Sequence, residues 1–284
     1  MRISSLLFAI LILLPSIALG STGEEVPSYQ PLIYRLAQDG FDPEYLSKIF
    51  DDPRSEPIPS LMTISLDSRE VQEIYSPFLT PESILQAKKF LRANLKLLRR
   101  MESRFHVDKE VVVAILFIES RFGENIGRHR VIPTLASMAL LDTPENLWSN
   151  YLMLWGIDPE LSYEWLEDRA KKRANWAYQE LKCFLRIIRD EKMDPLEVRG
   201  SYAGALGMAQ FIPSSYLAFA HRKKNLENWL LSREEAVFSI ANYLKSHGWK
   251  KNLTLERKKR ILWYYNQSEP YVETALQISK QIKH

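Results

Sequence analysis

The sequence contains a single cysteine, Cys183, and only ten glycines among its 284 residues. One cysteine excludes an intramolecular disulfide framework, so the fold depends on an apolar core. Cys183 lies in an apolar helical run (LKCFLRII), which indicates a core residue rather than a reactive thiol. The scarcity of glycine, together with 26% charged residues, favours helices over a β-sandwich or a barrel.

Common catalytic and metal-binding motifs are also missing. The five histidines have no partner at metal-ligand spacing, and no H-E-x-x-H motif occurs. No G-x-S-x-G motif is present, and the glycine-containing stretch 200–215 lacks the Gly-Lys-Ser/Thr ending of a phosphate loop. We therefore expect no cofactor. The formal charge of +3 is compatible with an anionic polymer but is not evidence for one.

An apolar run at the amino terminus has the pattern of a signal peptide. Arg2 precedes it, and Ala18 and Gly20 place small residues at positions −3 and −1 of a cleavage site. Residues 1–20 are therefore predicted to be removed on export; a membrane anchor is the alternative, but the run is short for a span. Because Ser21 stands where a lipoprotein would carry cysteine, we expect a soluble periplasmic protein without a nucleic-acid partner.

One carboxylate, Glu119, follows a run of apolar residues in the stretch Val111 to Gly123 (VVVAILFIESRFG). Asp108 is the predicted N-cap of this helix and Gly123 its C′ residue, which puts Glu119 in the last turn. The helix dipole and the apolar neighbours both disfavour the ionised form, so we expect a raised pKa, as a general acid requires. The alternative is a solvated helix end where Glu119 pairs with Arg121 or another arginine.

The rest of the chain is predicted to be helices joined by short loops. From apolar spacing and capping residues, further helices are expected at 30–39, 43–50, 80–105, 132–141, 166–190, 233–246, 259–265 and 271–282. Residues 53–59 are a proline-containing linker, 61–75 irregular or partly extended, and 142–161 rich in turn residues. Basic clusters at 171–173, 222–224 and 257–260 are interpreted as solvated helix faces.

Three segments have residues suited to sugar recognition. Gln210, in the glycine-containing stretch, can donate and accept hydrogen bonds, although a tight packing loop is the other interpretation. Trp249 is either a core residue or a stacking surface. In 264–271 (YYNQSEPY), tyrosine and asparagine together suit a sugar with an apolar ring face and several hydroxyls, although a single tyrosine more often serves packing.

These segments together resemble the lytic murein transglycosylases of the membrane-bound B type. The motifs that carry the resemblance are G-F-D at 40–42, F-L-T-P at 78–81, E-S-R-F-G at 119–123, G-S-Y-A-G-A-L-G at 200–207, Q-F-I-P-S at 210–214, N-Y at 242–243, H-G-W at 247–249 and Y-N-Q-S at 265–268. The motifs occur in the family's order, and together they span nearly all of the mature chain. The resemblance implies a mainly α, lysozyme-like catalytic domain at 76–284 with additional helices forming a substrate groove, and a helical segment and linker at 21–75 packing on it.

The resemblance also implies roles for individual residues. Glu119 aligns with the family's sole catalytic acid/base. The positions that line the family's glycan groove are Ser201, Gln210, Tyr243, Tyr265, Asn266 and Tyr271. The implied substrate is the glycan strand of peptidoglycan, cut between N-acetylmuramic acid (MurNAc) and N-acetylglucosamine (GlcNAc) with formation of a 1,6-anhydro ring. We expect a monomer, and the sequence identifies no partner among cell-wall synthesis or division proteins.

The sequence departs from the family pattern at three places. Phe122 replaces the usual tryptophan of E-T-R-W-G, which removes an indole donor beside the acid. Arg222 and Lys224 lie where the family's calcium loop needs oxygen ligands, so no metal is expected. The stretch 142–173 is longer than the family's usual connection and could be a rim of the groove or a partner site.

Two other functions stay open from the sequence. A muramidase would hydrolyse the same bond with water held by a second group, for which Asp142 and Glu145 are candidates. A non-catalytic peptidoglycan-binding protein is the second alternative, against which the intact Glu119 motif argues.

Overall fold

The computed structural model describes the chain except for residues 1–27, 68–71, 190, 192, 222–224 and 284. The predicted signal peptide and the basic cluster 222–224 therefore lie outside the described residues. Within the part described, no helix is both long and apolar enough to cross a membrane.

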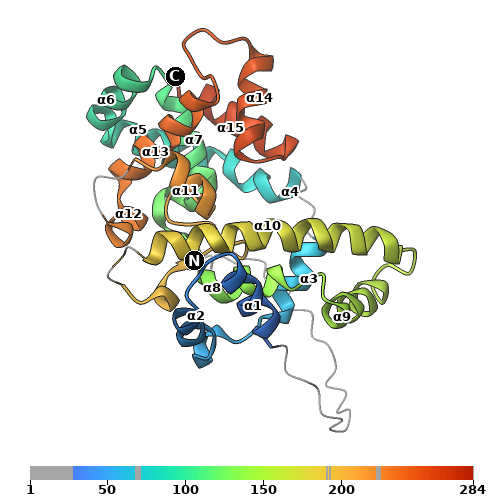
Figure 1. Ribbon diagram of the computed structural model, residues 1–284. Coiled ribbons are helices and arrows are strands. Elements are labelled where there is room, and N and C mark those ends of the chain that lie inside the picture. Colours follow the sequence, from blue (N-terminus) through green and yellow to red (C-terminus); the bar gives the residue numbers. More distant parts are fainter. Residues whose placement is uncertain (1–27, 68–71, 190, 192, 222–224, 284) are drawn as a thin grey trace, which may run out of the picture.

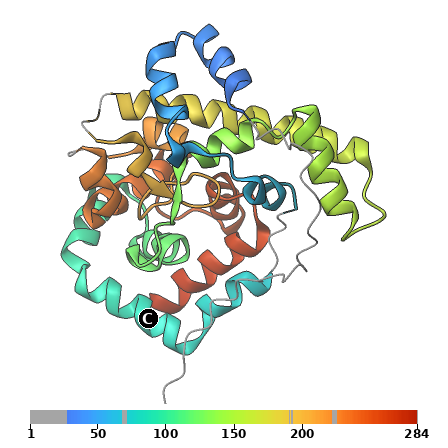
Figure 2. The same ribbon diagram turned by 90° about the horizontal axis from the view of Figure 1, so that it is seen from below.

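A long helix, α10 (Tyr163–Arg189), runs across the molecule between two groups of helices (Figures 1 and 2). The lower group in Figure 1 consists of α1 (Gln30–Gln38), α2 (Pro43–Phe50), α3 (Pro59–Asp67), α8 (Val131–Ala139) and α9 (Pro144–Trp155). The upper group contains α4 (Gln72–Tyr75), α5 (Pro81–Ala93), α6 (Leu95–Phe105), α7 (Lys109–Ser120), α11 (Pro213–Phe219), α12 (Leu226–Leu231), α13 (Arg233–Ser246), α14 (Leu255–Tyr265) and α15 (Glu269–Ile282).

The core of the upper group forms around α7. Its residues 110–117 are all buried, as expected for a helix that is apolar on every side. Helices α5, α6, α13 and α15 pack around it. Helix α10 packs most extensively on α8, and its buried residues include the small Ala170, Ala174 and Ala177, which allow neighbouring helices to approach closely.

A short antiparallel ladder, β1 (His129–Arg130) and β2 (Arg199–Gly200), joins the chain after α7 to the glycine-containing loop. The approach is so close that a Cβ on Gly127 would lie 2.0 Å from the carbonyl carbon of Gly200. Gly127 also has a φ of 90°, which other residues rarely adopt. The glycines therefore allow the loop to lie directly against the end of the α7 segment.

Three predictions about local structure were wrong. The expected helix 80–105 is broken at Asn94, whose side-chain Nδ2 donates to the carbonyl of Phe90 at 2.8 Å and competes with the helix ladder. Residues 59–67 form helix α3 rather than irregular chain, because burial of Leu61, Met62 and Leu66 outweighs the weak helix propensity of this stretch. The turn-rich stretch contains α9, with Pro144 at its first position after Thr143.

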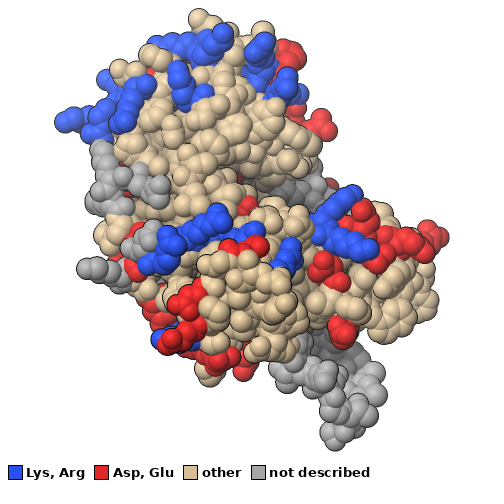
Figure 3. Space-filling view, in the orientation of Figure 1, with Lys and Arg blue, Asp and Glu red and all other residues tan. Residues whose placement is uncertain are grey.

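The surface charge differs between the two groups of helices. On the face in Figure 3, Lys and Arg side chains gather mainly over the upper group, while Asp and Glu concentrate around the lower group and the α9 end of α10. On this face, therefore, the two signs of charge are unevenly distributed.

Candidate functional site

Glu119 lies in the last turn of α7, as the sequence predicts. Its side chain is half-buried, while the residues before it up to Phe117 are fully enclosed. A carboxylate at the edge of a core is both positioned by packing and open to a ligand, which is the arrangement that acid–base catalysis needs.

The N-cap of α7 is Asp108, as predicted, although its side chain makes no capping hydrogen bond. The carboxyl end of the helix differs from the prediction. There Arg121, with a φ of 48°, closes the helix, and Gly123 ends the 3-10 turn that follows. Ser120 Oγ holds this turn because it accepts from the N–H of Gly123 at 3.0 Å and donates to the carbonyl of Met208 at 2.7 Å.

The carboxylate of Glu119 accepts a hydrogen bond from Tyr271, with 2.7 Å between Oη and Oε1. Tyr271 is in the first turn of α15 and is 1% exposed. Burial is the main cause, and the negative charge of Glu119 the second, of a Tyr271 pKa well above its usual value. The hydroxyl therefore stays protonated, and a donor, at any physiological pH. This hydrogen-bond donor favours the ionised form of Glu119, whereas the helix dipole and the apolar neighbours favour the protonated form. The raised pKa expected for Glu119 stays a prediction.

The structure also places Arg121, the alternative ion-pair partner of Glu119. Its guanidinium lies 4.8 Å from the ring centre of Phe78. The arginine therefore contributes a cation–π contact at the helix end.

Three of the predicted groove residues form a layer of tyrosines behind the acid. Tyr265 stacks on Tyr271 at 6.4 Å between ring centres and 7° between planes, and Tyr243 meets Tyr265 edge-on at 4.9 Å. Tyr265 donates to the carbonyl of Ala209 at 2.7 Å, and Tyr243 donates to that of Tyr264. Burial raises the pKa of Tyr243 to about 12 and that of Tyr265 well above its usual value. These hydroxyls hold the site together.

The glycine-containing loop positions two more predicted groove residues. Ser201 Oγ accepts hydrogen bonds from the N–H groups of Ala203 and Ala205 at 3.1 and 3.0 Å, which fixes the turn. Gln210 has a φ of 48°, and its Nε2 donates to the carbonyl of Ile126 at 3.2 Å. Because Ile126 follows the acid-bearing turn, Gln210 links the loop to that turn.

Phe122, which stands in the position of the family's tryptophan, is part of an aromatic stack. Its ring lies 3.9 Å from Phe90 with 6° between planes, and 4.9 Å from Phe117 with 13° between planes. The replacement thus keeps apolar packing beside the acid but supplies no hydrogen-bond donor.

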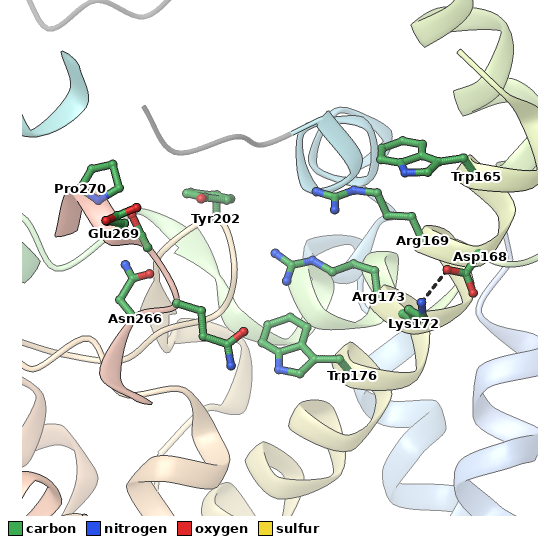
Figure 4. Close-up of a pocket in the computed structure, with 12 residues that line it drawn as sticks. Trp165, Asp168, Arg169, Lys172, Arg173, Trp176, Tyr202, Asn266, Glu269 and Pro270 are labelled. Atoms are coloured by element: carbon green, nitrogen blue, oxygen red, sulfur yellow. Dashed lines mark hydrogen bonds and ion pairs between the residues drawn. The ribbon is translucent and has the colours of Figure 1, made fainter. Parts of the chain in front are cut away.

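A cavity of about 710 Å³ lies between α10 and the segment 266–270 that leads into α15 (Figure 4). Asn266, the sixth predicted groove residue, is in its wall. The opposite wall, which we call the α10 wall, consists of Trp165, Asp168, Arg169, Lys172, Arg173 and Trp176. Pro270, in the cavity wall, is followed in the sequence by Tyr271, whose hydroxyl contacts Glu119.

The sequence suggested 142–173 as a rim of the groove or a partner site, but it identified no individual residue of the α10 wall and interpreted Lys171 to Arg173 as solvated. Arg173 is instead half-buried, and its buried Nε has no hydrogen-bond partner in the structure. A pattern that could have revealed the wall is the spacing of Trp165, Arg169, Arg173 and Trp176, which puts all four on one helix face.

The carboxylates proposed for a water-activating role lie elsewhere. Asp142 follows α8 in the lower group of helices, where burial raises its pKa and Arg35 and Lys171 act against the rise. Glu145 lies in the first turn of α9 in the same group. Neither position favours a second catalytic carboxylate beside Glu119.

Among the described residues, no group of three or more His, Cys, Asp and Glu side chains could hold a metal ion. The predicted basic loop at Arg222 and Lys224 lies outside the described residues. Next to it, the buried carboxylate of Glu235 already contacts His221 Nδ1 at 3.1 Å, so it is not a ready oxygen ligand.

Known proteins share both the sequence and the fold. The family model described as "Transglycosylase SLT domain" matches residues 25–261. The membrane-bound lytic murein transglycosylase B of Escherichia coli (strain K12) is 28% identical over 240 residues, which are 79% of this chain and 58% of that protein. The chain thus spans less than two thirds of this curated relative.

Two solved structures are similar in fold. The Escherichia coli lytic transglycosylase Slt35 in complex with calcium has a TM-score of 0.70 at 21% identity, over 93% of this chain and 95% of that one. SltB3 from Pseudomonas aeruginosa in complex with NAG-NAM-pentapeptide has a TM-score of 0.68 at 19% identity, over 90% and 80%. They confirm the predicted mainly α, lysozyme-like fold. With a family model matching most of its length, the chain belongs to the transglycosylase SLT domain family.

Proposed function

We propose that this protein is a lytic transglycosylase that cleaves the β-1,4 bond between MurNAc and GlcNAc in peptidoglycan and leaves 1,6-anhydro-MurNAc ends. The observation that carries the proposal is the position of Glu119 at the end of a buried helix, with Tyr271 Oη 2.7 Å from its carboxylate. The family and the murein transglycosylase B relative support the reaction class. The NAG-NAM-pentapeptide bound to SltB3 supports the substrate.

In the first step, protonated Glu119 donates its proton to the bridging oxygen as the glycosidic bond breaks. The oxocarbenium-like charge at C1 of MurNAc is stabilised by the sugar's own N-acetyl oxygen, as in substrate-assisted glycosidases. The two candidates for a second carboxylate, Asp142 and Glu145, lie in the lower group of helices and not beside Glu119. The Tyr271 hydroxyl then holds the ionised Glu119 in place through its hydrogen bond.

In the second step, the Glu119 carboxylate takes the proton of the 6-hydroxyl of the same MurNAc. The 6-oxygen attacks C1, the 1,6-anhydro ring closes, and Glu119 is again protonated. Water is not consumed, because the sugar's own 6-oxygen replaces the leaving oxygen at C1; the reaction is an intramolecular transfer rather than a hydrolysis.

The substrate groove is proposed to be lined by Ser201, Gln210, Tyr243, Tyr265, Asn266 and Tyr271. The internal hydrogen bonds of the serine, the glutamine and the tyrosines make their contribution one of shape and rigidity. Asn266, in the cavity wall, is the residue proposed to contact the sugar through its amide.

The protein is proposed to act in the periplasm as a soluble monomer after removal of residues 1–20. The position of Ser21, in place of a lipidated cysteine, supports this arrangement. We expect amino-terminal sequencing of the exported protein to begin at or near Ser21; a membrane-bound form that retains Met1 would contradict it.

Digestion of purified cell-wall sacculi, followed by mass spectrometry of the soluble products, tests the reaction. A lytic transglycosylase releases muropeptides with anhydro-MurNAc ends. Products with reducing MurNAc ends would identify a muramidase instead, and an absence of soluble products would identify a binding protein.

A further inference from the structure

The cavity between α10 and the segment 266–270 has an unusual distribution of charge. Its α10 wall brings three basic side chains, those of Arg169, Lys172 and Arg173, to one side. Lys172 is paired with Asp168 at 2.6 Å, on the side of α10 away from the centre of the cavity (Figure 4). The guanidinium groups of Arg169 and Arg173 point instead toward Tyr202 and the segment 266–270 (Figure 4).

Arg173 is held in place but is not neutralised by the protein. Its guanidinium lies 4.6 Å from the ring centre of Trp176, and no ion pair among the described residues includes it. Its Nε is buried without a hydrogen-bond partner. Burial lowers the pKa of Arg173, although a guanidinium stays protonated in proteins. Removing such a cation from water costs free energy unless an anion pairs with it.

Arg169 adds a second cation in a fixed position. Its Nε donates to the carbonyl of Leu66, and its guanidinium lies 5.5 Å from the ring centre of Trp165. Across the cavity, the exposed carboxylate of Glu269 supplies a negative charge. A complementary ligand therefore carries carboxylates toward α10 and an ammonium group toward α15, together with enough apolar surface to lie on two indoles.

We propose that this cavity binds the stem peptide of peptidoglycan, with Arg169 and Arg173 holding its carboxylates and Glu269 its diamino-acid ammonium. The inference rests on the proposed function, because a stem peptide attached to MurNAc reaches the cavity only if the glycan lies along Glu119. The chemistry fits, since the stem contains a γ-linked glutamate with a free carboxylate, a diamino acid and a carboxyl end.

The test compares two substrates and three proteins. Intact sacculi carry stem peptides, whereas glycan strands treated with an amidase lack them. The release of anhydro-MurNAc products is measured on both for wild type, Arg173→Gln and Arg186→Gln. Arg186 is an exposed arginine of the same helix outside the cavity, so it controls for loss of one positive charge.

We expect Arg173→Gln to lower the ratio of cleavage of sacculi to cleavage of stripped strands by about tenfold, the value of one charge-assisted hydrogen bond. Arg186→Gln should keep the wild-type ratio within about twofold, and Arg173→Lys should recover part of it. Equal losses on both substrates would overturn the peptide site and leave the lytic reaction standing. Failure of wild type to release anhydro products from either substrate would instead overturn the proposed function.

A direct measurement covers the case in which Arg173→Gln folds poorly. Wild-type protein is titrated with the free tetrapeptide L-Ala-γ-D-Glu-meso-diaminopimelate-D-Ala while the indole N–H signals are followed by NMR. We expect saturable shifts of the Trp165 and Trp176 signals, weakened at least tenfold when the peptide carboxylates are amidated. No shift, or an equal response to inorganic phosphate, would overturn the proposal.

Discussion

The surroundings of Glu119, which we call the acid side of the site, and the α10 wall differ in whether their polar groups have partners inside the protein. Around Glu119, polar groups are matched inside the protein: Tyr271 donates to Glu119, and Ser120 donates to Met208. On the α10 wall, Arg173 is half-buried with an unmatched Nε. The first arrangement fixes a reactive group before the substrate arrives, and the second leaves a charge for a ligand to complete.

The strongest test of the acid side is Glu119→Gln. We expect cleavage to fall by at least about 10²–10⁴-fold, because glutamine keeps the shape of glutamate but cannot transfer a proton and one group serves both steps. The melting temperature should stay near that of wild type, since the amide oxygen can still accept from Tyr271. Anhydro-muropeptide release and thermal melting are the measurements.

The matched control for that variant is Glu110→Gln, the same change at the other end of α7. Glu110 is buried and pairs with Lys109 at 3.0 Å, so its loss should affect stability more than cleavage. More than about a tenth of wild-type cleavage in Glu119→Gln would end its assignment as the acid.

The next largest effect is expected from Tyr271→Phe. Removing the hydroxyl leaves a Glu119 carboxylate oxygen without this donor, which costs about 1–3 kcal/mol, so the cleavage rate should fall about ten- to a hundredfold. The pH–rate profile should also change, because the hydroxyl stabilises one ionisation state of the acid. Tyr264→Phe, at an exposed tyrosine, is the control. An unchanged rate and profile in Tyr271→Phe would remove the tyrosine from the mechanism.

A smaller effect, on the pH dependence of stability, is expected from Glu180 on the buried face of α10, away from the cavity. Glu180 is 5% exposed and accepts from the N–H and Oγ of Ser214 at 2.8 and 2.7 Å. Burial raises its pKa, so the folded state favours the protonated acid. Its contribution to stability is therefore fully present below the usual pKa near 4.5 and is lost as the pH rises through the raised value.

Glu180→Gln should remove that pH dependence. We expect the free energy of unfolding of the variant, relative to wild type, to increase as the pH is raised from 4 to 8 in urea titrations. The exposed Glu82→Gln should show no such trend. A difference that stays constant with pH would show that Glu180 does not titrate with folding.

The smallest expected effect concerns calcium. The basic residues Arg222 and Lys224 stand where oxygen ligands are needed, and Glu235 already contacts His221. The melting temperature should therefore stay within about 1 °C when millimolar calcium or EDTA is added. A calcium ion that did bind, at a hundred times its Kd, would stabilise the fold by about 2.7 kcal/mol and raise the melting temperature clearly. A clear rise with calcium that EDTA reverses would contradict this expectation.

Local sequence patterns determined the helical fold and the acid. The apolar run before Glu119 requires a buried helix, and the spacing of its residues places the carboxylate in the last turn. Thr80 and Pro81 likewise mark the start of α5, where Thr80 Oγ1 accepts from the N–H of Ser83 at 3.2 Å. Such features depend on neighbours within one or two helical turns, so the chain alone specifies them.

The tertiary structure alone decided which distant residues meet. Tyr271 reaches Glu119 across 152 residues, and no helical period specifies that contact. The role of Arg173 likewise depended on packing, because a basic cluster on a helix is solvated unless another segment covers it, as 266–270 faces it here. Helix propensity is a small free energy, whereas burial and unmatched charges are larger and non-local, and these decided the site.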